Sequence, residues 1–310
     1  MAAVSVGIDV SKDHLDVFVR PGGESFRVVR EGEGLDELVE QLQALEPTVI
    51  ALEATGGLEA VVAANLGAAG LPVIVVNPAQ VRSFAQALGK RAKTDPIDAS
   101  VIAHFAEATK PELRALPDEA TRLFSELLTR RKQIVRMIVA ERQREQSLSD
   151  PRLKKSVRRL LKALERELKA MDKDLDDAIR KTPAWREKED LLKSVPGVGP
   201  IVARTLLAEM PELGTLSRRE VASLAGLAPF TRQSGRWRGK SFIGGGRANV
   251  RAALYMGALV AVRHNPVLKR FYEQLLARGK AKKLALVAVA RKLLAILNAL
   301  LRDQKSWVSA

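Results

Sequence analysis

The feature that most constrains the fold is a long stretch without glycine, which runs from residue 90 to residue 196. It is mostly charged and aliphatic, a composition that favours long helices over a sheet. Six apolar residues in it step by four and three, the spacing of a coiled-coil seam: Val157, Leu161, Leu164, Leu168, Met171 and Leu175. The seam covers under three heptads, so it predicts either a packed helical hairpin that turns near Asp150 and Pro151 or a dimer zipper.

The residues before this stretch predict a mixed α/β layer. VSVGIDV, HLDVFVR and SFRVVR alternate or run apolar and are broken by PGG, as in an antiparallel meander. GLDELVEQLQAL is amphipathic at helical spacing, and then come TVIALEA, a helix over about 58–66, PVIVV and a helix that opens near Pro78. Three antiparallel strands followed by alternating helices and strands is the order of a ribonuclease H-like layer.

Four carboxylates lie where this layer could bring them to one point. Asp9 and Glu53 end apolar strand segments, and Asp95 and Asp98 stand one helical turn apart on one face of a helix. Anionic oxygen donors repel each other unless a cation is bound, and hard divalent ions such as Mg²⁺ or Mn²⁺ prefer oxygen ligands. Asp13 and Asp16 follow the turn after the first strand, where we expect them to be solvated.

Charge divides the chain into an acidic part and a basic part. Residues 1–110 hold 9 Lys and Arg against 15 Asp and Glu, whereas the remainder holds 42 against 21. The strongly basic remainder predicts a polyanionic partner bound through counterion release, with a merely soluble basic surface as the alternative. Aromatic residues make up only 4% of the chain, so extensive base stacking is not expected.

Several classes of protein are excluded by composition. The chain has no cysteine and only three histidines, so it has neither disulfides nor a zinc pattern. We see no signal peptide, and LALVAVARKLLAILNALL carries Arg291 and Lys292 at its centre, which favours a buried helix over a membrane span. We expect a cytoplasmic protein without membrane contact.

The region after Trp185 carries two glycine-containing motifs. LLKSVPGVGPIVARTLLAEM has the form of a helix-hairpin-helix, in which Gly197 and Gly199 would let the backbone approach a phosphate. An ordinary turn between two helices is the alternative. Residues 244–247, GGGR, open a helix and predict either a phosphate cradle or a flexible turn. We expect His104 and His264 to be packed or surface residues rather than ligands.

Five blocks in one order, GIDVSK, LEATGG, KTDPIDA, SVPGVGP and LAGLAPFTRQSG…GGR, give the chain a family resemblance. The sequence resembles the DEDD transposases of the insertion-sequence one-ten family over essentially its whole length. GIDVSK alone would be weak, because actin-like ATPases open similarly, but the chain lacks their second phosphate loop.

The resemblance implies roles for particular residues. It implies a RuvC-like fold whose acidic tetrad, Asp9, Glu53, Asp95 and Asp98, binds Mg²⁺ next to the scissile phosphate, and a nucleophilic serine at Ser234, which Gly235 follows. Some members of the family are guided by a bridge RNA.

The sequence around Ser234 offers further candidates. Ser241 is the rival nucleophile, and Trp237 would stack on a base or simply pack. Basic residues around the serine could neutralise a phosphoryl transition state. The residues that we expect to bind nucleic acid are Gly197, Gly199, Arg232, Arg236, Arg238, Lys240 and Arg247.

These observations predict a RuvC-like domain over 1–110, a helical arm over 111–185 and a mostly helical transposase domain over 186–310. Such a recombinase would cut and rejoin DNA through a phosphoserine intermediate and act as a dimer or tetramer. Two alternatives stay open. One is a hydrolytic nuclease, such as a junction resolvase, in which Ser234 only holds phosphate, and the other is a non-catalytic nucleic-acid-binding protein.

Overall fold

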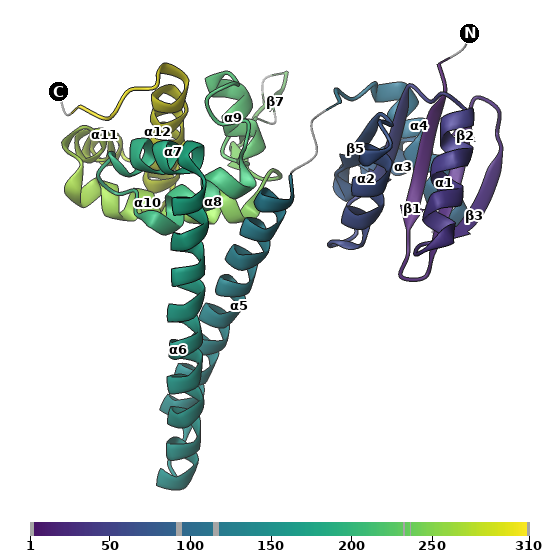
Figure 1. Ribbon diagram of the computed structural model, residues 1–310. Coiled ribbons are helices and arrows are strands. Elements are labelled where there is room, and N and C mark those ends of the chain that lie inside the picture. The colour runs from purple at the N-terminus through teal and green to yellow at the C-terminus, as the bar shows by residue number, and fades with distance from the viewer. Residues whose placement is uncertain (1–2, 91–94, 114–117, 232, 236, 309–310) are drawn as a thin grey trace. The chain divides into compact units, whose positions relative to one another are not determined.

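The computed structural model divides the chain into two compact units, residues 1–117 and 118–310 (Figure 1). It describes residues 3–90, 95–113, 118–231, 233–235 and 237–308, without the side chains of 95–97, 237 and 238. Each unit has its own apolar core. The domain boundaries expected near residues 110 and 185 stay predictions.

The first unit is built on a five-stranded mixed sheet in the order β3-β2-β1-β4-β5. The central strand β1 pairs antiparallel with β2 and parallel with β4, and β5 extends the parallel side. This order confirms the expected meander followed by alternating strands and helices. The bounds are β1 Ser5–Val10, β2 His14–Arg20, β3 Ser25–Val29, β4 Val49–Glu53 and β5 Val73–Val76.

Helices cover both faces of this sheet. On one face, Val6 and Ile8 of β1 pack with apolar residues of α1 and α2. On the other face, Ala51 of β4 packs with Val81 of α3 and Ile102 of α4. The alternation of side chains along β1 and β4 therefore decides which residues meet α4. The bounds are α1 Glu33–Ala44, α2 Leu58–Ala68, α3 Pro78–Ala87 and α4 Asp95–Thr109.

Gly7 lets helix α4 lie directly on the central strand. A Cβ atom at Gly7 would come within 2.2 Å of the Ala103 nitrogen and 2.4 Å of the Ala99 carbonyl oxygen. Both are helix backbone atoms that cannot move aside alone, so any side chain at residue 7 would push α4 off the sheet.

We therefore expect Gly7→Ala to lower the free energy of unfolding by about 1–3 kcal/mol, as overpacking does elsewhere. Gly22 offers a matched control, because a Cβ there would meet only the Glu24 side chain, at 3.8 Å. Urea denaturation of the two variants checks this, and equal stability would show that α4 is not held against β1 as described.

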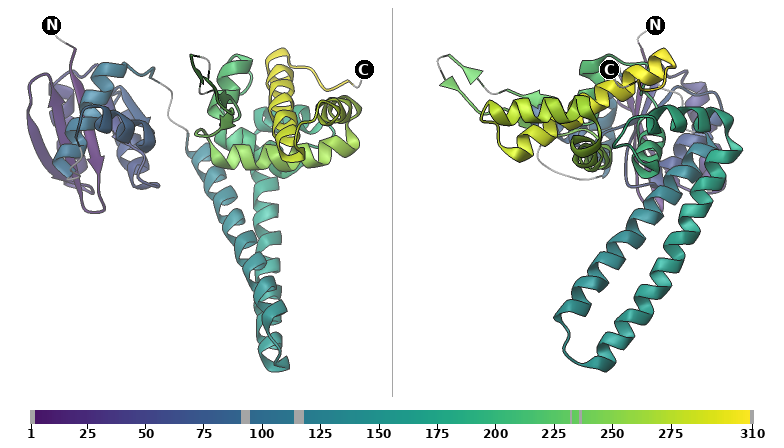
Figure 2. Two further views of the ribbon diagram at one scale, coloured as in Figure 1. Left: turned by 180° about the vertical axis from the view of Figure 1, so that it is seen from behind. Right: turned by 90° about the vertical axis from the view of Figure 1, so that its left-hand side faces the viewer.

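The second unit begins with a long helical hairpin, α5 Glu119–Ser147 and α6 Pro151–Lys181 (Figures 1 and 2). The Asp150 side chain caps α6 by accepting hydrogen bonds from the Arg152 and Leu153 backbone N–H groups. The predicted seam of α6 packs on α5 of the same chain, with Leu161 against Ile134 and Ile138. This confirms the hairpin interpretation, since the seam is filled within one chain.

The rest of this unit is a helical body with a small β-ribbon. Helix α12 is long and apolar enough to cross a bilayer by length and composition, but half of its most apolar window is buried. It lies in the core, as expected for a buried helix. Asn265 lies between α10 and α11, and its side chain caps α11. The bounds are α7 Pro183–Lys193, α8 Pro200–Glu209, α9 Arg218–Leu224, α10 Ala248–His264, α11 Pro266–Ala277 and α12 Lys282–Asp303.

Candidate active-site residues

Asp9 and Glu53 lie side by side at the carboxyl ends of two neighbouring parallel strands. The last recorded pair between β1 and β4 joins Ile8 to Leu52, and each carboxylate is the next residue along its strand. Neighbouring strands are about 4.8 Å apart, so the two residues start from adjacent backbone positions. Each is partly buried.

Both carboxylates belong to the sheet face that α4 covers. Side chains alternate along a strand, so Asp9 shares a face with Gly7, which contacts the α4 backbone. Glu53 likewise shares a face with Ala51, which packs in the same cluster as Ile102 of α4.

Helix α4 brings its first turn to the same edge of the sheet. Near its other end, Glu107 pairs with Arg20 at 2.7 Å, and Arg20 lies opposite Ser5 at the start of β1. Helix α4 thus runs antiparallel to β1, so Asp95 and Asp98 lie toward the end where Asp9 emerges. The backbone positions of Asp9, Glu53, Asp95 and Asp98 are therefore consistent with the prediction that all four lie at one edge of the sheet.

Only part of this arrangement is defined at the level of side chains. Asp98 is partly buried, whereas the side chain of Asp95 lies outside the described residues. Among the side chains that the structure does describe, no group of three acidic or histidine residues is close enough to hold a metal ion. The donors are oxygen atoms suited to Mg²⁺, but a complete site would need Asp95, and metal binding stays a prediction.

Asp16 corrects one expectation from the sequence. We expected both Asp13 and Asp16 to be solvated. Asp13 is exposed, but Asp16 is only 7% exposed and lies in β2 directly opposite Asp9. Arg27 on β3 donates hydrogen bonds to both of its carboxylate oxygens, at 2.9 and 3.1 Å. The sharp turn after β1 puts Asp16 back beside Asp9, and Arg27 offsets its charge.

Ser234 lies at the tip of the ribbon in the second unit. In the inner hairpin Gln233 pairs with Arg238 and Ser234 pairs with Trp237. Ser234 is exposed, and no hydrogen bond within the described part of the chain engages its hydroxyl group. The ribbon strands are β6 Pro229–Phe230, β7 Gln233–Ser234, β8 Trp237–Arg238 and β9 Phe242–Ile243.

Four of the predicted nucleic-acid contacts fall between residues 232 and 240 in the sequence. Lys240 is exposed. Arg232 and Arg236 lie outside the described residues, as do the side chains of Trp237 and Arg238. The rival nucleophile Ser241 has its hydroxyl 3.4 Å from that of Thr231. The structure thus places both serines on one ribbon and leaves their chemical roles as predictions.

The segment predicted to form a helix-hairpin-helix consists of α7, a turn and α8, and the first glycine of the turn faces the protein. A Cβ atom at Gly197 would come within 2.5 Å of the Ala261 Cβ atom on α10. Gly199 is exposed, and a Cβ there would meet no atom within 4 Å. Close packing on α10 is therefore the observed reason for glycine at residue 197, and phosphate binding by either glycine stays a prediction.

Arg204, which the sequence did not single out, ties this hairpin to the arm. It is 6% exposed and donates hydrogen bonds to Glu189 at 2.8 Å and Asp176 at 2.5 Å. Burial alone would lower the pKa of Arg204, but these two carboxylates raise it above its ordinary value. The signal in the sequence was an arginine inside the apolar run IVARTLLAEM.

Arg247, another predicted nucleic-acid contact, is engaged within the protein. Its guanidinium donates two hydrogen bonds to Glu212, at 2.5 and 2.6 Å. The glycine before it, Gly246, leaves room for the backbone of Gly226, because a Cβ atom would come within 2.3 Å of the Gly226 nitrogen. The GGGR segment is therefore a turn that packs against other parts of the protein at the base of the ribbon.

Neither histidine of the helical segments contributes to these sites. His104 packs edge-on against Phe84, with ring centroids 5.2 Å apart, and His264 is exposed at the end of α10. Both were expected to be packed or surface residues.

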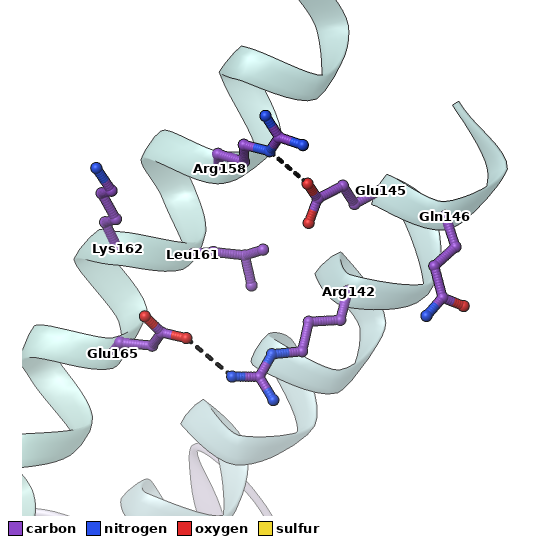
Figure 3. A pocket seen from close by; sticks show the side chains of 7 residues that line it. All are labelled: Arg142, Glu145, Gln146, Arg158, Leu161, Lys162 and Glu165. Atoms are coloured by element: carbon purple, nitrogen blue, oxygen red, sulfur yellow. Dashed lines mark hydrogen bonds and ion pairs between the residues drawn. The ribbon is translucent and has the colours of Figure 1, made fainter. Parts of the chain in front are cut away.

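A pocket of about 450 Å³ lies between the two helices of the arm (Figure 3). Arg142 pairs with Glu165 and Arg158 pairs with Glu145 across it, while Leu161 lies between them. Because these pairs join one helix to the other, the pocket is explained by packing within the arm.

Comparison with known proteins gives matches along most of the chain. A family model described as "Transposase" matches residues 6–150, and one described as "Transposase IS116/IS110/IS902 family" matches residues 189–273. Proteins named "Pilin gene-inverting protein" from Moraxella bovis and Moraxella lacunata are each 28% identical over 317 residues, covering 99% of this chain and 98% of the relative. An "Insertion element IS110 uncharacterized 43.6 kDa protein" of Streptomyces coelicolor is 35% identical over 116 residues, covering 36% of this chain and 28% of the relative.

Proposed function

Because the chain belongs to the IS116/IS110/IS902 family of transposases, we propose that it cuts and rejoins DNA through a covalent bond to Ser234, assisted by a carboxylate-bound divalent ion. The rejoining of DNA is supported by the similarity, over nearly the full length of the chain, to proteins named for inverting a gene. Inversion requires that cut ends be joined again, which a hydrolytic nuclease does not do.

The first unit serves in this proposal as a RuvC-like catalytic domain. Support comes from the sheet order, with a central β1 between an antiparallel meander and parallel strands. Support also comes from the shared edge at which Asp9 and Glu53 end their strands beneath the first turn of α4.

The residues that would hold Mg²⁺ or Mn²⁺ are Asp9, Glu53, Asp95 and Asp98. A divalent ion bound there would polarise the phosphoryl oxygen and stabilise the charge that develops in the transition state. The carboxylates would fix the position of the ion, and the apolar packing of α4 on the sheet supports the helix that carries Asp95 and Asp98.

Ser234 supplies the nucleophile. Its Oγ atom would form a bond to phosphorus while the bond from phosphorus to one bridging oxygen of the DNA strand breaks. The serine hydroxyl proton would pass to water, and the leaving oxygen would take a proton from water and depart as a DNA hydroxyl group. The energy of the phosphodiester bond is kept in the phosphoserine. A DNA hydroxyl group can therefore attack the phosphorus, release the serine and rejoin a strand. Arg232, Arg236 and Arg238 would neutralise the phosphoryl group.

A complete centre needs both units, because the carboxylates belong to the first and Ser234 to the second. Joining two DNA molecules also needs several such centres. We propose a dimer or tetramer in which the serine of one subunit completes the acidic site of another.

Guidance by a bridge RNA is part of the same proposal and is supported by the family. Sequencing the nucleic acid that copurifies with the chain, and comparing it with the DNA that flanks its gene, tests this. Preparations that are active on DNA without any RNA would contradict it.

The charge of the second unit predicts how binding depends on salt. Residues 118–310 hold 41 Lys and Arg against 20 Asp and Glu. We expect the logarithm of DNA affinity to fall with the logarithm of salt concentration by about 0.9 per neutralised phosphate. Lys240→Gln should reduce this slope by roughly one if Lys240 contacts a phosphate.

Lys110 offers the control for this measurement. It is exposed and follows the end of α4 that lies away from the carboxylates. Lys110→Gln should leave the slope unchanged in fluorescence anisotropy titrations. A wild-type affinity that does not change with salt would remove the electrostatic basis of the proposal.

A further inference from the structure

Two phenylalanines form an exposed aromatic surface at the base of the ribbon that carries Ser234. Phe230 is 49% exposed and Phe242 is 45% exposed. They are directly opposite each other on paired strands, with ring centroids 6.0 Å apart and ring planes 32° apart. Directly opposite residues of an antiparallel pair share a face, so the two rings form one apolar plate, which we call the Phe plate.

The Phe plate is unusual within this chain. Of the aromatic side chains that the structure describes, only Phe230 and Phe242 are exposed, and the others are at least partly buried. The plate also lies on a ribbon that extends beyond the helical body of its unit (right-hand view of Figure 2). Nearly half of each of these two residues is thus open to solvent.

The charge around the Phe plate identifies the chemistry of its partner. From residue 221 to residue 272 the chain has nine Lys and Arg and no Asp or Glu. Among them Lys240 is exposed on the ribbon, two residues before Phe242. Arg247, one of the nine, is paired with Glu212, but the other eight leave this segment with an excess of positive charge. An aromatic surface in such a segment suits a ligand that combines anionic groups with flat rings, as a nucleic-acid strand does.

We infer that the Phe plate stacks on a base of the DNA strand whose phosphate Ser234 attacks. This inference rests on the proposed function, and it names the element that holds the strand beside the nucleophile. Ser234 is the fourth residue after Phe230, a reach of at most about 14 Å. The stacked base therefore lies within roughly four nucleotide steps of the attacked phosphate, at 3.4 Å per step.

The test uses the full chain without divalent ions, so that no strand is cut. The probe is a single-stranded oligonucleotide of mixed sequence, with the fluorescent base 2-aminopurine at several positions. Stacking tolerates any base, so the target sequence is not needed. The variant carries Phe230→Leu and Phe242→Leu, which keep apolar side chains on the ribbon but remove both ring faces.

We expect the double variant to bind roughly 5- to 150-fold more weakly, the range of stacking contributions for one base. Its 2-aminopurine signal on binding should be lost while the salt dependence stays as in wild type, because phosphate contacts are unchanged. The single variant Phe230→Trp, in which Phe242 is intact, should keep the 2-aminopurine signal of wild type. Met256→Ala, which removes an apolar side chain that is 58% exposed on α10, should bind like wild type.

Three outcomes separate the possibilities. Wild-type affinity and signal in the double variant would overturn the inference. A lower oligomeric mass of the double variant in analytical ultracentrifugation, with base signals intact, would also overturn it and identify the plate as a protein interface. If the wild-type chain binds no DNA at all, the proposed function itself fails.

Discussion

Replacement of Asp9 by Asn is expected to lower DNA strand cleavage by about 10³-fold or more while DNA binding stays within about twofold of wild type. Asn has nearly the same shape as Asp but lacks its charge. Asp9 lies at the end of the central strand beside Glu53, so the substitution removes one of the carboxylates proposed to hold the divalent ion. The basic second unit, which we expect to bind DNA, is unchanged.

Asp13→Asn is the matched control for this experiment, because Asp13 is an exposed carboxylate only four residues away. It should cut DNA like wild type in Mg²⁺. Denaturing electrophoresis of labelled DNA and an equilibrium binding titration measure the two properties separately. Wild-type cleavage by Asp9→Asn would refute the metal-site proposal, and equal loss in both variants would point to a general effect of charge.

The second large effect is expected from Ser234→Ala, which should abolish both the covalent protein–DNA adduct and strand exchange. The hydroxyl group is exposed and makes no hydrogen bond in the described part of the chain, so its loss should change stability by less than about 0.5 kcal/mol. Thermal unfolding of the variant should match that of wild type.

Ser241→Ala is the control on the same ribbon and should retain the adduct. If Ser241→Ala loses the adduct while Ser234→Ala keeps it, the nucleophile is one loop away from our assignment. If wild type and both variants cut DNA without ever forming an adduct, the chain is a hydrolytic nuclease.

The sequence predicted the order of the sheet because strand pattern and turn chemistry are local. PGG separates the second and third strands, and the alternating helices and strands that follow leave few topologies open. The positions of Asp9 and Glu53 on adjacent strand ends follow from that order. The heptad seam of α6 was also visible, although only the structure shows that it packs on α5 of the same chain.

What could not be predicted depends on three-dimensional packing. The burial of Asp16 follows from the register of β1 and β2, which places it opposite Asp9 and next to Arg27. Gly197 faces α10 because of how the whole hairpin packs, and no local pattern encodes that direction. The pairing of Arg247 with Glu212 joins residues far apart in sequence. A basic residue near a glycine motif therefore looked like a phosphate contact until its partner was known.

The most direct test of the central claim is to identify the residue that carries DNA after the reaction. Trypsin cuts after Lys and Arg, so it would place Ser234 in the peptide QSGR and Ser241 in the peptide SFIGGGR. Wild-type protein is incubated with Mg²⁺, the DNA ends of its element and any copurifying RNA, then denatured, digested with nuclease and trypsin, and analysed by mass spectrometry. We predict a nucleotide phosphate on the Ser234 peptide alone. A nucleotide on the Ser241 peptide, or cut DNA with no modified peptide, would contradict a phosphoserine at residue 234.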